Sequence, residues 1–315
     1  MSAPIMSAGP HIRSTNSSRR IMLDVIIALL PAAIASVVLF GFKALAIIVT
    51  CIAAAVASEY LFNVITKHEQ TVGDFSAVLT GLLLALNIST NAALWECAIG
   101  AVFAIVLVKC VFGGLGKNFA NPAITGRVFM LLAFSSVAGG AMPKMVDAVS
   151  SATPLEVLGG LDLGALDFTT LPTLGNMLLG VRGGAIGEGC IIALVIGFVY
   201  LLIRKVIKWH VPVIFIGTVF LCYIIATGNL MFSVYEILSG GLFLGAIFMA
   251  TDYVTTPIST KGRALFALGC GLITFIIRYF CAYPEGVSFS ILLMNLLTPA
   301  IEKITPNKPL GGTKK

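Results

Sequence analysis

The stretch TGLLLALNIST, residues 80–90, decides the fold because the chain contains a second version of it. GGLFLGAIFMAT at 240–251 repeats its glycine and two of its leucines at the same spacing. Further along each half, NPAI at 121–124 matches TPAI at 298–301. Glycine and proline are common in all membrane helices, which is the alternative explanation for these matches. We interpret them as an internal repeat.

The chain is too apolar for a soluble protein. Hydrophobic residues make up 58% of its 315 residues and charged residues 11%, whereas soluble domains carry about 25% charged residues. The net charge is +6, but the basic residues are spread over short loops and tails and give no indication of a nucleic-acid partner. The composition therefore predicts an integral membrane protein.

Ten apolar runs are expected to cross the membrane as helices of about 20 residues each. Five crossings per half is an odd number, so the halves would be inverted, and inverted repeats place binding sites at their interface. We predict an all-α membrane protein with about ten transmembrane helices in two inverted five-helix repeats, similar to a urea channel. The third and eighth runs are short and interrupted. The runs are 21–40, 44–65, 75–91, 93–112, 122–140, 187–204, 211–228, 235–251, 264–282 and 287–303.

The distribution of lysine and arginine predicts the orientation. Positive residues gather in both tails and in the loops after the sixth and eighth runs, which ten crossings place on one side. The positive-inside rule makes that side the cytoplasm. The expected division is a cytoplasmic tail at 1–20, membrane repeats at 21–140 and 187–303, an extracytoplasmic loop at 141–186 and a cytoplasmic tail at 304–315.

The long outer loop contains DAVSSATPLEVL at 147–158. One interpretation is structural: Thr153 caps a helix that starts at Pro154, and Glu156 completes a capping box. The other is chemical. A helix N-terminus favours a phosphate group, and the threonine hydroxyl there could carry an esterified phosphate that anchors a cofactor. Both interpretations use the same local fold.

DAVSSATPL at 147–155 resembles the covalent flavinylation motif of respiratory complexes. With FGGLGKNFANPAITGR at 112–127 and the ten segments, it makes the chain resemble the D subunits of the Rnf ion-translocating ferredoxin:NAD oxidoreductase over about residues 20–305. That family is homologous to the B subunit of the Na⁺-translocating NADH:quinone oxidoreductase. The resemblance implies FMN bound to Thr153 through a phosphoester bond. The other motif residues are Asp147, Ser150, Ser151, Ala152, Pro154 and Leu155, with Ser151 where many such sites have glycine.

The resemblance also implies a function. The chain would carry electrons through FMN between ferredoxin and NAD in a redox-driven Na⁺ or H⁺ pump of the bacterial cytoplasmic (inner) membrane. It would not be active alone and would hold no catalytic residue of its own. The implied partners are the other membrane and peripheral subunits, among them a second flavin-bearing subunit on the outer face, together with the flavin transferase and membrane lipid.

Two alternatives stay open. One is the B-type subunit of the quinone-reducing branch, although a first segment that starts near residue 21 favours the ferredoxin:NAD branch. The other is a solute channel or transporter with a five-plus-five inverted repeat and no redox role.

The stretch at 112–127 is rich in helix-breaking glycine and proline. It is either a cytoplasmic turn that packs against its repeat partner or a place where Asn121 lines a site for an ion or a flavin. The resemblance implies a second flavin, a non-covalent riboflavin.

Four acidic residues are candidates for an ion path, because a charge at the bilayer centre costs about 2.5–3.5 kcal/mol on insertion scales and is expected to be functional. Glu59 and Glu96 lie deepest, and each could instead form a structural pair with a basic residue. Asp74 and Asp252 lie at segment edges, where solvation by interfacial water is the alternative. The histidines and cysteines lack metal-ligand spacing, so no metal site is predicted.

Overall fold

The computed structural model describes residues 17–138, 143, 153–159, 171–281 and 285–306. Helices are the regular elements of this part, which contains no β-strand. The first half contains α1 (Ser18–Phe40), α2 (Phe42–Thr66), the 3-10 helix η1 (Val72–Asp74), α3 (Ser76–Leu86), α4 (Leu94–Val102), the π-helix η2 (Phe103–Cys110), α5 (Pro122–Ala133) and α6 (Ser135–Ala138).

Short helices connect the two halves: α7 (Pro154–Gly159), α8 (Leu174–Leu179) and the 3-10 helix η3 (Ile186–Glu188). The second half then repeats the pattern of long and broken helices. It contains α9 (Ile191–Ile203), α10 (His210–Thr227), α11 (Leu230–Leu238), α12 (Leu242–Leu244), the π-helix η4 (Gly245–Met249), α13 (Thr260–Phe280) and α14 (Val287–Ile304).

The helix lengths confirm an all-α protein of the membrane type. Within the described part, five helices are long and apolar enough to cross a bilayer, namely α1, α2, α10, α13 and α14. A sixth span arises if α11 and the α12–η4 segment count as one helix bent by 65°. Three more apolar helices, α3, α5 and α9, have only 10–17 residues. Ten crossings and inverted symmetry stay predictions.

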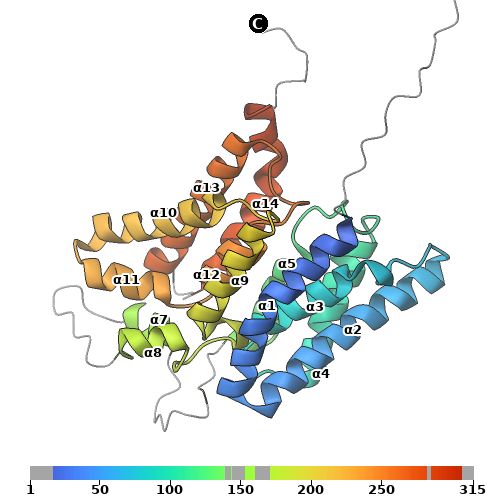
Figure 1. Ribbon diagram of the computed structural model, residues 1–315, viewed down its shortest axis with the longest axis horizontal. Coiled ribbons are helices and arrows are strands. Elements are labelled where there is room, and N and C mark those ends of the chain that lie inside the picture. The colour runs from blue at the N-terminus through green and yellow to red at the C-terminus, as the bar shows by residue number, and fades with distance from the viewer. Residues whose placement is uncertain (1–16, 139–142, 144–152, 160–170, 282–284, 307–315) are drawn as a thin grey trace, which may run out of the picture.

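The two halves lie side by side (Figure 1), with α1 to α5 on one side and α9 to α14 on the other. The start of α1 and the end of α14 lie at the upper end of the helices in this view, whereas α7 and α8 lie at the lower end beside α11. The short connecting helices are therefore at the end of the molecule opposite the start of α1.

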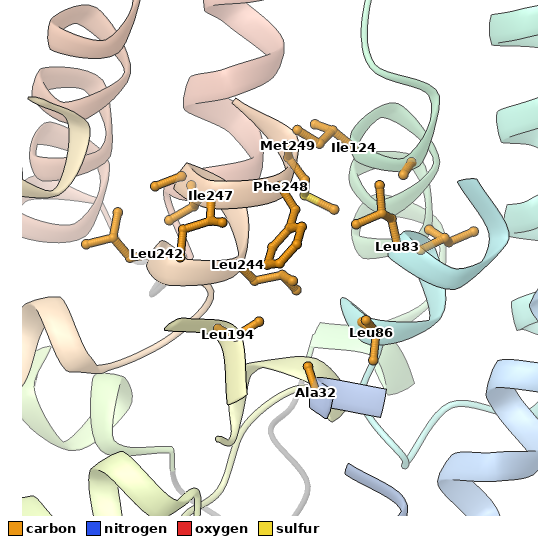
Figure 2. Close-up of a cluster of buried hydrophobic side chains, with 14 of the residues drawn as sticks. Ala32, Leu83, Leu86, Ile124, Leu194, Leu242, Leu244, Ile247, Phe248 and Met249 are labelled. Carbon is orange, nitrogen blue, oxygen red and sulfur yellow. The ribbon is translucent and has the colours of Figure 1, made fainter. Parts of the chain in front are cut away.

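The two stretches that define the repeat meet in the core. Figure 2 shows Leu83 and Leu86 of α3 facing Leu244 and Phe248 of the second half. All four side chains are buried, with exposed fractions of 0–5%. Both stretches break a membrane helix, because α3 ends before the bilayer would be crossed and α12 passes into a π-helix after three residues.

The second pair of matching motifs occupies different positions. Pro122 is the first residue of α5, and Asn121 caps that helix by accepting from the N–H groups of Ala123 and Ile124. Pro299 instead lies inside α14, near its end. The two motifs are therefore at opposite ends of their helices.

Candidate functional site

Thr153 lies directly before α7 and forms the predicted capping box. The Glu156 N–H donates to Thr153 Oγ1 at 3.2 Å, and the Thr153 N–H donates to Glu156 Oε2 at 2.8 Å. A hydroxyl oxygen has two lone pairs, so the cap leaves one free. The structural interpretation is confirmed. The argument from a helix N-terminus is weaker than predicted, because α7 has only six residues and sums few peptide dipoles.

Buried side chains attach α7 to the second half. Pro154, Leu155 and Leu158 are buried, whereas Thr153 is partly exposed. Leu155 Cδ2 lies 3.3 Å from the position that a Cβ of Gly240 would take. Gly240 has φ +63°, a left-handed conformation that favours glycine. The helix that follows Thr153 is therefore packed on the turn that breaks α11 from α12, as its place in Figure 1 also indicates.

Two buried arginines donate to carbonyl groups at this break. Arg278 donates to Glu236 O at 2.8 Å and to Ser239 O at 3.2 Å. Arg182 donates to Leu238 O. The last carbonyls of a helix have no partner within the helix. The arginines provide donors for Leu238 O and Ser239 O, whereas Glu236 O also accepts from the Ser239 N–H at 3.3 Å. The break that α7 packs against is thus a hydrogen-bonded turn.

Arg127, on α5, connects the two halves through buried charges. It donates to Asn87 Oδ1 at the end of α3, and its Nη2 lies 3.3 Å from Glu188 Oε1. The same nitrogen forms an ion pair with Glu285, just before α14. Arg127 Nε is buried without a partner among the described residues. We call Asn87, Arg127, Glu188 and Glu285 the junction cluster.

Glu59 forms the structural pair that the sequence left open. Lys109 Nζ lies 2.8 Å from both carboxylate oxygens of Glu59 and donates to Ser76 Oγ at 2.6 Å. Thr71 donates to Glu59 at 2.5 Å, and the Ser76 N–H donates to Asp74 Oδ1 at 2.8 Å. We call Glu59, Thr71, Asp74, Ser76 and Lys109 the Lys109 cluster. Two of the predicted ion-path acids belong to it.

The other two predicted acids lie elsewhere. Glu96 Oε2 accepts from the Ala93 N–H at 2.8 Å and from Ser136 Oγ at 2.6 Å, so it caps the start of α4. Asp252 Oδ2 accepts from Thr255 Oγ1 at 3.0 Å and lines a cavity. The four acids therefore do not form one site.

This cavity lies between the two halves, at the end where α1 begins. Its lining residues are mostly apolar and come from α1, α3, η2, α5, α9 and η4. The cavity has a volume of about 80 Å³. Asn121 lines it as the sequence suggested, and so does Asn118. The side-chain oxygen of Asn118 is buried and has no hydrogen-bond partner in the described part of the chain. We call it the apolar cavity.

The glycines that precede Asn118 in the chain adopt the tight backbone that the sequence predicted. Gly113, Gly114 and Gly116 have φ values of 106°, 88° and 92°, in the left-handed region. They turn the chain from η2 back to α5, so that Asn118 and Asn121 reach the cavity.

Of the flavinylation motif, Asp147, Ser150, Ser151 and Ala152 lie outside the described residues. Sequence patterns assigned no role to several residues that the structure brings to these sites. For Asn118 the sequence did contain a signal, because this residue lies in the glycine-rich stretch at 112–127. For the other residues it contained none. The residues without an assigned role are Asn87, Asn118, Arg182, Glu188 and Glu285.

Comparison with known proteins gives full-length matches. The model of the NQR2, RnfD, RnfE family matches residues 5–311. The D subunit of the Na(+)-translocating ferredoxin:NAD(+) oxidoreductase complex of Acetobacterium woodii is 42% identical over 98% of this chain and 96% of the relative. The D subunit of the proton-translocating ferredoxin:NAD(+) oxidoreductase complex of Clostridium ljungdahlii is 42% identical over 97% and 96%. The D subunit of the ion-translocating oxidoreductase complex of Halorhodospira halophila is 34% identical over 98% and 95%.

Proposed function

Because the chain belongs to the NQR2, RnfD, RnfE family, we propose that it is the D subunit of an ion-translocating ferredoxin:NAD⁺ oxidoreductase complex. The observation that carries this proposal is 42% identity to two proteins of that description over nearly the whole of each chain. One of these relatives is named for Na⁺ and the other for the proton, so their similarity supports ion translocation by either cation. The apolar spans support a subunit that lies in the membrane.

The proposed setting is the bacterial cytoplasmic membrane, with both termini in the cytoplasm. The start of α1 and the end of α14 at one end of the helices support this orientation. The helix α7, which begins directly after Thr153, lies at the opposite end (Figure 1). A second flavin-bearing subunit would then approach from the outer side. The proposed ten-helix inverted repeat adds five segments to the five helices that are long enough alone: α3, α5, α9, the continuous α4–η2 segment and the bent segment from α11 to η4.

The proposed redox group at the outer end is FMN esterified to Thr153. The residues fit it: the side chain is partly exposed, its oxygen keeps a free lone pair, and buried Leu155 holds the attachment point against Gly240. When bound, FMN supplies one- and two-electron transfer. The chain supplies a fixed position for the group. Arg182 adds positive charge at the break that α7 packs on, whereas Arg278 is paired there with Glu236 at 3.5 Å.

Flavin loading of matched threonine variants tests this attachment. Thr173 is a suitable control, because it also caps a short helix, accepting from the Asn176 N–H at 3.4 Å at the start of α8. In cells that express the flavin transferase, Thr153→Ala should abolish the fluorescent band of the chain on a denaturing gel. Thr173→Ala should keep it, and mass spectrometry of the 145–158 peptide should show one FMN moiety in the parent chain. A band that persists in Thr153→Ala, or an unmodified peptide from the native complex, contradicts the proposal.

The apolar cavity is the proposed site of a second, non-covalent flavin of the riboflavin type. Its walls suit an apolar ring, and the unpaired oxygen of Asn118 can accept from a ring N–H. The lining contains no cation other than Lys109 among the described residues, and that ammonium is bonded to Glu59 and Ser76. Within this cavity alone, a flavin without a phosphate therefore fits better than FMN. Such a flavin supplies a redox centre between the two halves.

Asn118→Leu should reduce the flavin that denaturation releases from the purified complex. Loss of one hydrogen bond to a buried group predicts about a tenfold loss of affinity. Asn176→Leu is the control, because Asn176 is exposed on α8 and far along the chain from the cavity. The covalent fluorescence of Thr153 should be the same in both variants. Equal amounts of released flavin in Asn118→Leu and Asn176→Leu would place the second flavin elsewhere.

A further inference from the structure

A second cavity adjoins the apolar cavity and has a different chemistry. Its volume is about 240 Å³. Lys205, Lys208 and Arg263 line it, beside hydroxyl-bearing residues. Within the described residues, no acidic side chain lines this cavity or forms an ion pair with any of the three cations. We call it the basic pocket.

Local structure does not explain why these cations are placed together. Lys205, two residues after the end of α9 at Ile203, has φ 55°, in the left-handed region that favours glycine. Lys208 comes just before α10, and Arg263 is in the first turn of α13. A cation at the start of a helix opposes the helix dipole. The positive-inside rule accounts for basic residues on this side of the membrane, but not for three that converge on one hollow.

Arg263 is held in a position to bind an anion. Its Nε donates to Pro257 O at 2.9 Å, which fixes the guanidinium group. Its two Nη groups have no hydrogen-bond partner among the described residues, so they can bind two oxygens of one anion in parallel. Lysine ammonium groups beside such a fork add charge without a strict geometry. This set of donors fits a phosphate group.

The surroundings of the pocket favour a phosphate that belongs to a lipid. Ile203, Trp209 and Ile258 flank it in the chain and are 75%, 62% and 71% exposed. A free phosphate needs no apolar surface, whereas acyl chains do, and tryptophan is typical of the membrane interface. Basic pockets between membrane helices on the cytoplasmic side bind anionic headgroups. We propose that the basic pocket binds the phosphate of an anionic phospholipid, whose acyl chains lie along Ile203 and Ile258.

A lipid in this position would strengthen a wall of the apolar cavity. Val206, Ile207, Thr251 and Tyr253 line both cavities. Tyr253 donates its hydroxyl hydrogen to Val206 O, which ties the η4–α13 connection to the turn after α9. Bound lipid is therefore expected to stabilise the chain against unfolding.

Lipid titration of the purified, complete complex tests the site. Phosphatidylglycerol or phosphatidylcholine is added to delipidated complex in neutral detergent, and bound lipid is counted by native mass spectrometry. The parent complex should retain phosphatidylglycerol and gain thermal stability, and phosphatidylcholine should give neither effect. In Lys205→Gln/Lys208→Gln the affinity for phosphatidylglycerol should fall about 30-fold, as expected for two cations near an anionic lipid. Arg263 is left intact because its bond to Pro257 also serves the fold.

The control is Lys261→Gln/Lys303→Gln, which removes the same charge from two exposed lysines outside the pocket. It should bind phosphatidylglycerol like the parent complex. An equal loss in both double variants would show diffuse attraction and overturn the proposal. Two other results would also overturn the proposal. Complete displacement of the lipid by inorganic phosphate would indicate a site for free phosphate. Loss of a neighbouring subunit from Lys205→Gln/Lys208→Gln, with its lipid retained, would indicate a protein interface.

Discussion

The Lys109 cluster and the junction cluster both bury a cation among carboxylates, but they differ in completeness and in what they connect. All three N–H donors of Lys109 have partners, two on Glu59 and one on Ser76, and the Glu59 and Lys109 side chains are each 1% exposed. All of these residues belong to the first half. Arg127 instead reaches across to the segment before α14, keeps an unpaired Nε, and faces a Glu285 side chain that is 21% exposed.

This difference separates a structural cluster from a site where charge can change. A fully bonded buried ion pair holds one arrangement, because any change leaves an uncompensated charge in a medium of low polarity. An incompletely bonded cluster with access to water can gain or lose a proton at smaller cost. Its position between the halves is also where inverted-repeat transporters bind their coupling ions. The junction cluster is therefore the better candidate for coupling electron transfer to ion movement.

Removal of the cation from the complete cluster should give the largest effect. Lys109→Met leaves Glu59 buried and unpaired, which should lower the free energy of unfolding by about 3–5 kcal/mol. Glu59→Gln/Lys109→Met should recover most of this loss, because no buried charge is left. Thermal unfolding of the detergent-purified complex measures both. If the single variant unfolds at the parent temperature, the Lys109 cluster is not the closed structural unit described above.

The matching change in the junction cluster should lower the free energy of unfolding less, but it should impair ion translocation more. Arg127→Met removes hydrogen bonds to buried acidic groups, but Glu285 can stay protonated and contact water, so a loss of about 2–3 kcal/mol is expected. In reconstituted complex, the number of ions moved per electron should fall in Arg127→Met and stay at the parent value in Glu59→Gln/Lys109→Met. The reverse result would assign coupling to the Lys109 cluster.

The two clusters also show which contacts a sequence can predict. The capping box of Thr153 is predictable because its partners are three residues apart and their geometry follows from one helical turn. Arg127 and Glu285 are 158 residues apart, and no local pattern connects them. Glu59 and Lys109, 50 apart, are each recognisable as buried charges, but only the fold selects their pairing over an ion path.

In the core, too, the sequence predicts local patterns but not the details that depend on the three-dimensional fold. The stretches at 80–90 and 240–251 are recognisable as related, and the structure places them in contact. The sequence does not predict the π-helices η2 and η4. A π-helix differs from an α-helix in its hydrogen-bond spacing, and a run of apolar residues looks the same in either helix. The sequence points to Asn121 and not to Asn118, although both line the apolar cavity, since an unpaired buried oxygen is visible only in three dimensions.

The smallest expected effect is the contribution of Glu285 to the pH dependence of stability. Burial raises the pKa of Glu285 to about 8, although Arg127 acts to lower it. In the unfolded chain this carboxyl titrates near its usual pKa of about 4.3. Between these values the unfolded chain has lost a proton that the folded chain keeps, so the stability of the folded chain falls as the pH rises through this window.

The size of this effect makes it a test of the contrast between the clusters. One pH unit changes the free energy of unfolding by at most about 1.4 kcal/mol, and we expect roughly half of that, because contact with water weakens the shift. Unfolding midpoints at about pH 5.5 and about pH 7.5 should therefore differ more in the parent complex than in Glu285→Gln. The variant Glu59→Gln/Lys109→Met should keep the parent difference, because its junction cluster is intact. Equal pH dependence in the parent and Glu285→Gln would remove Glu285 as the titrating group and, with it, the contrast between the two clusters.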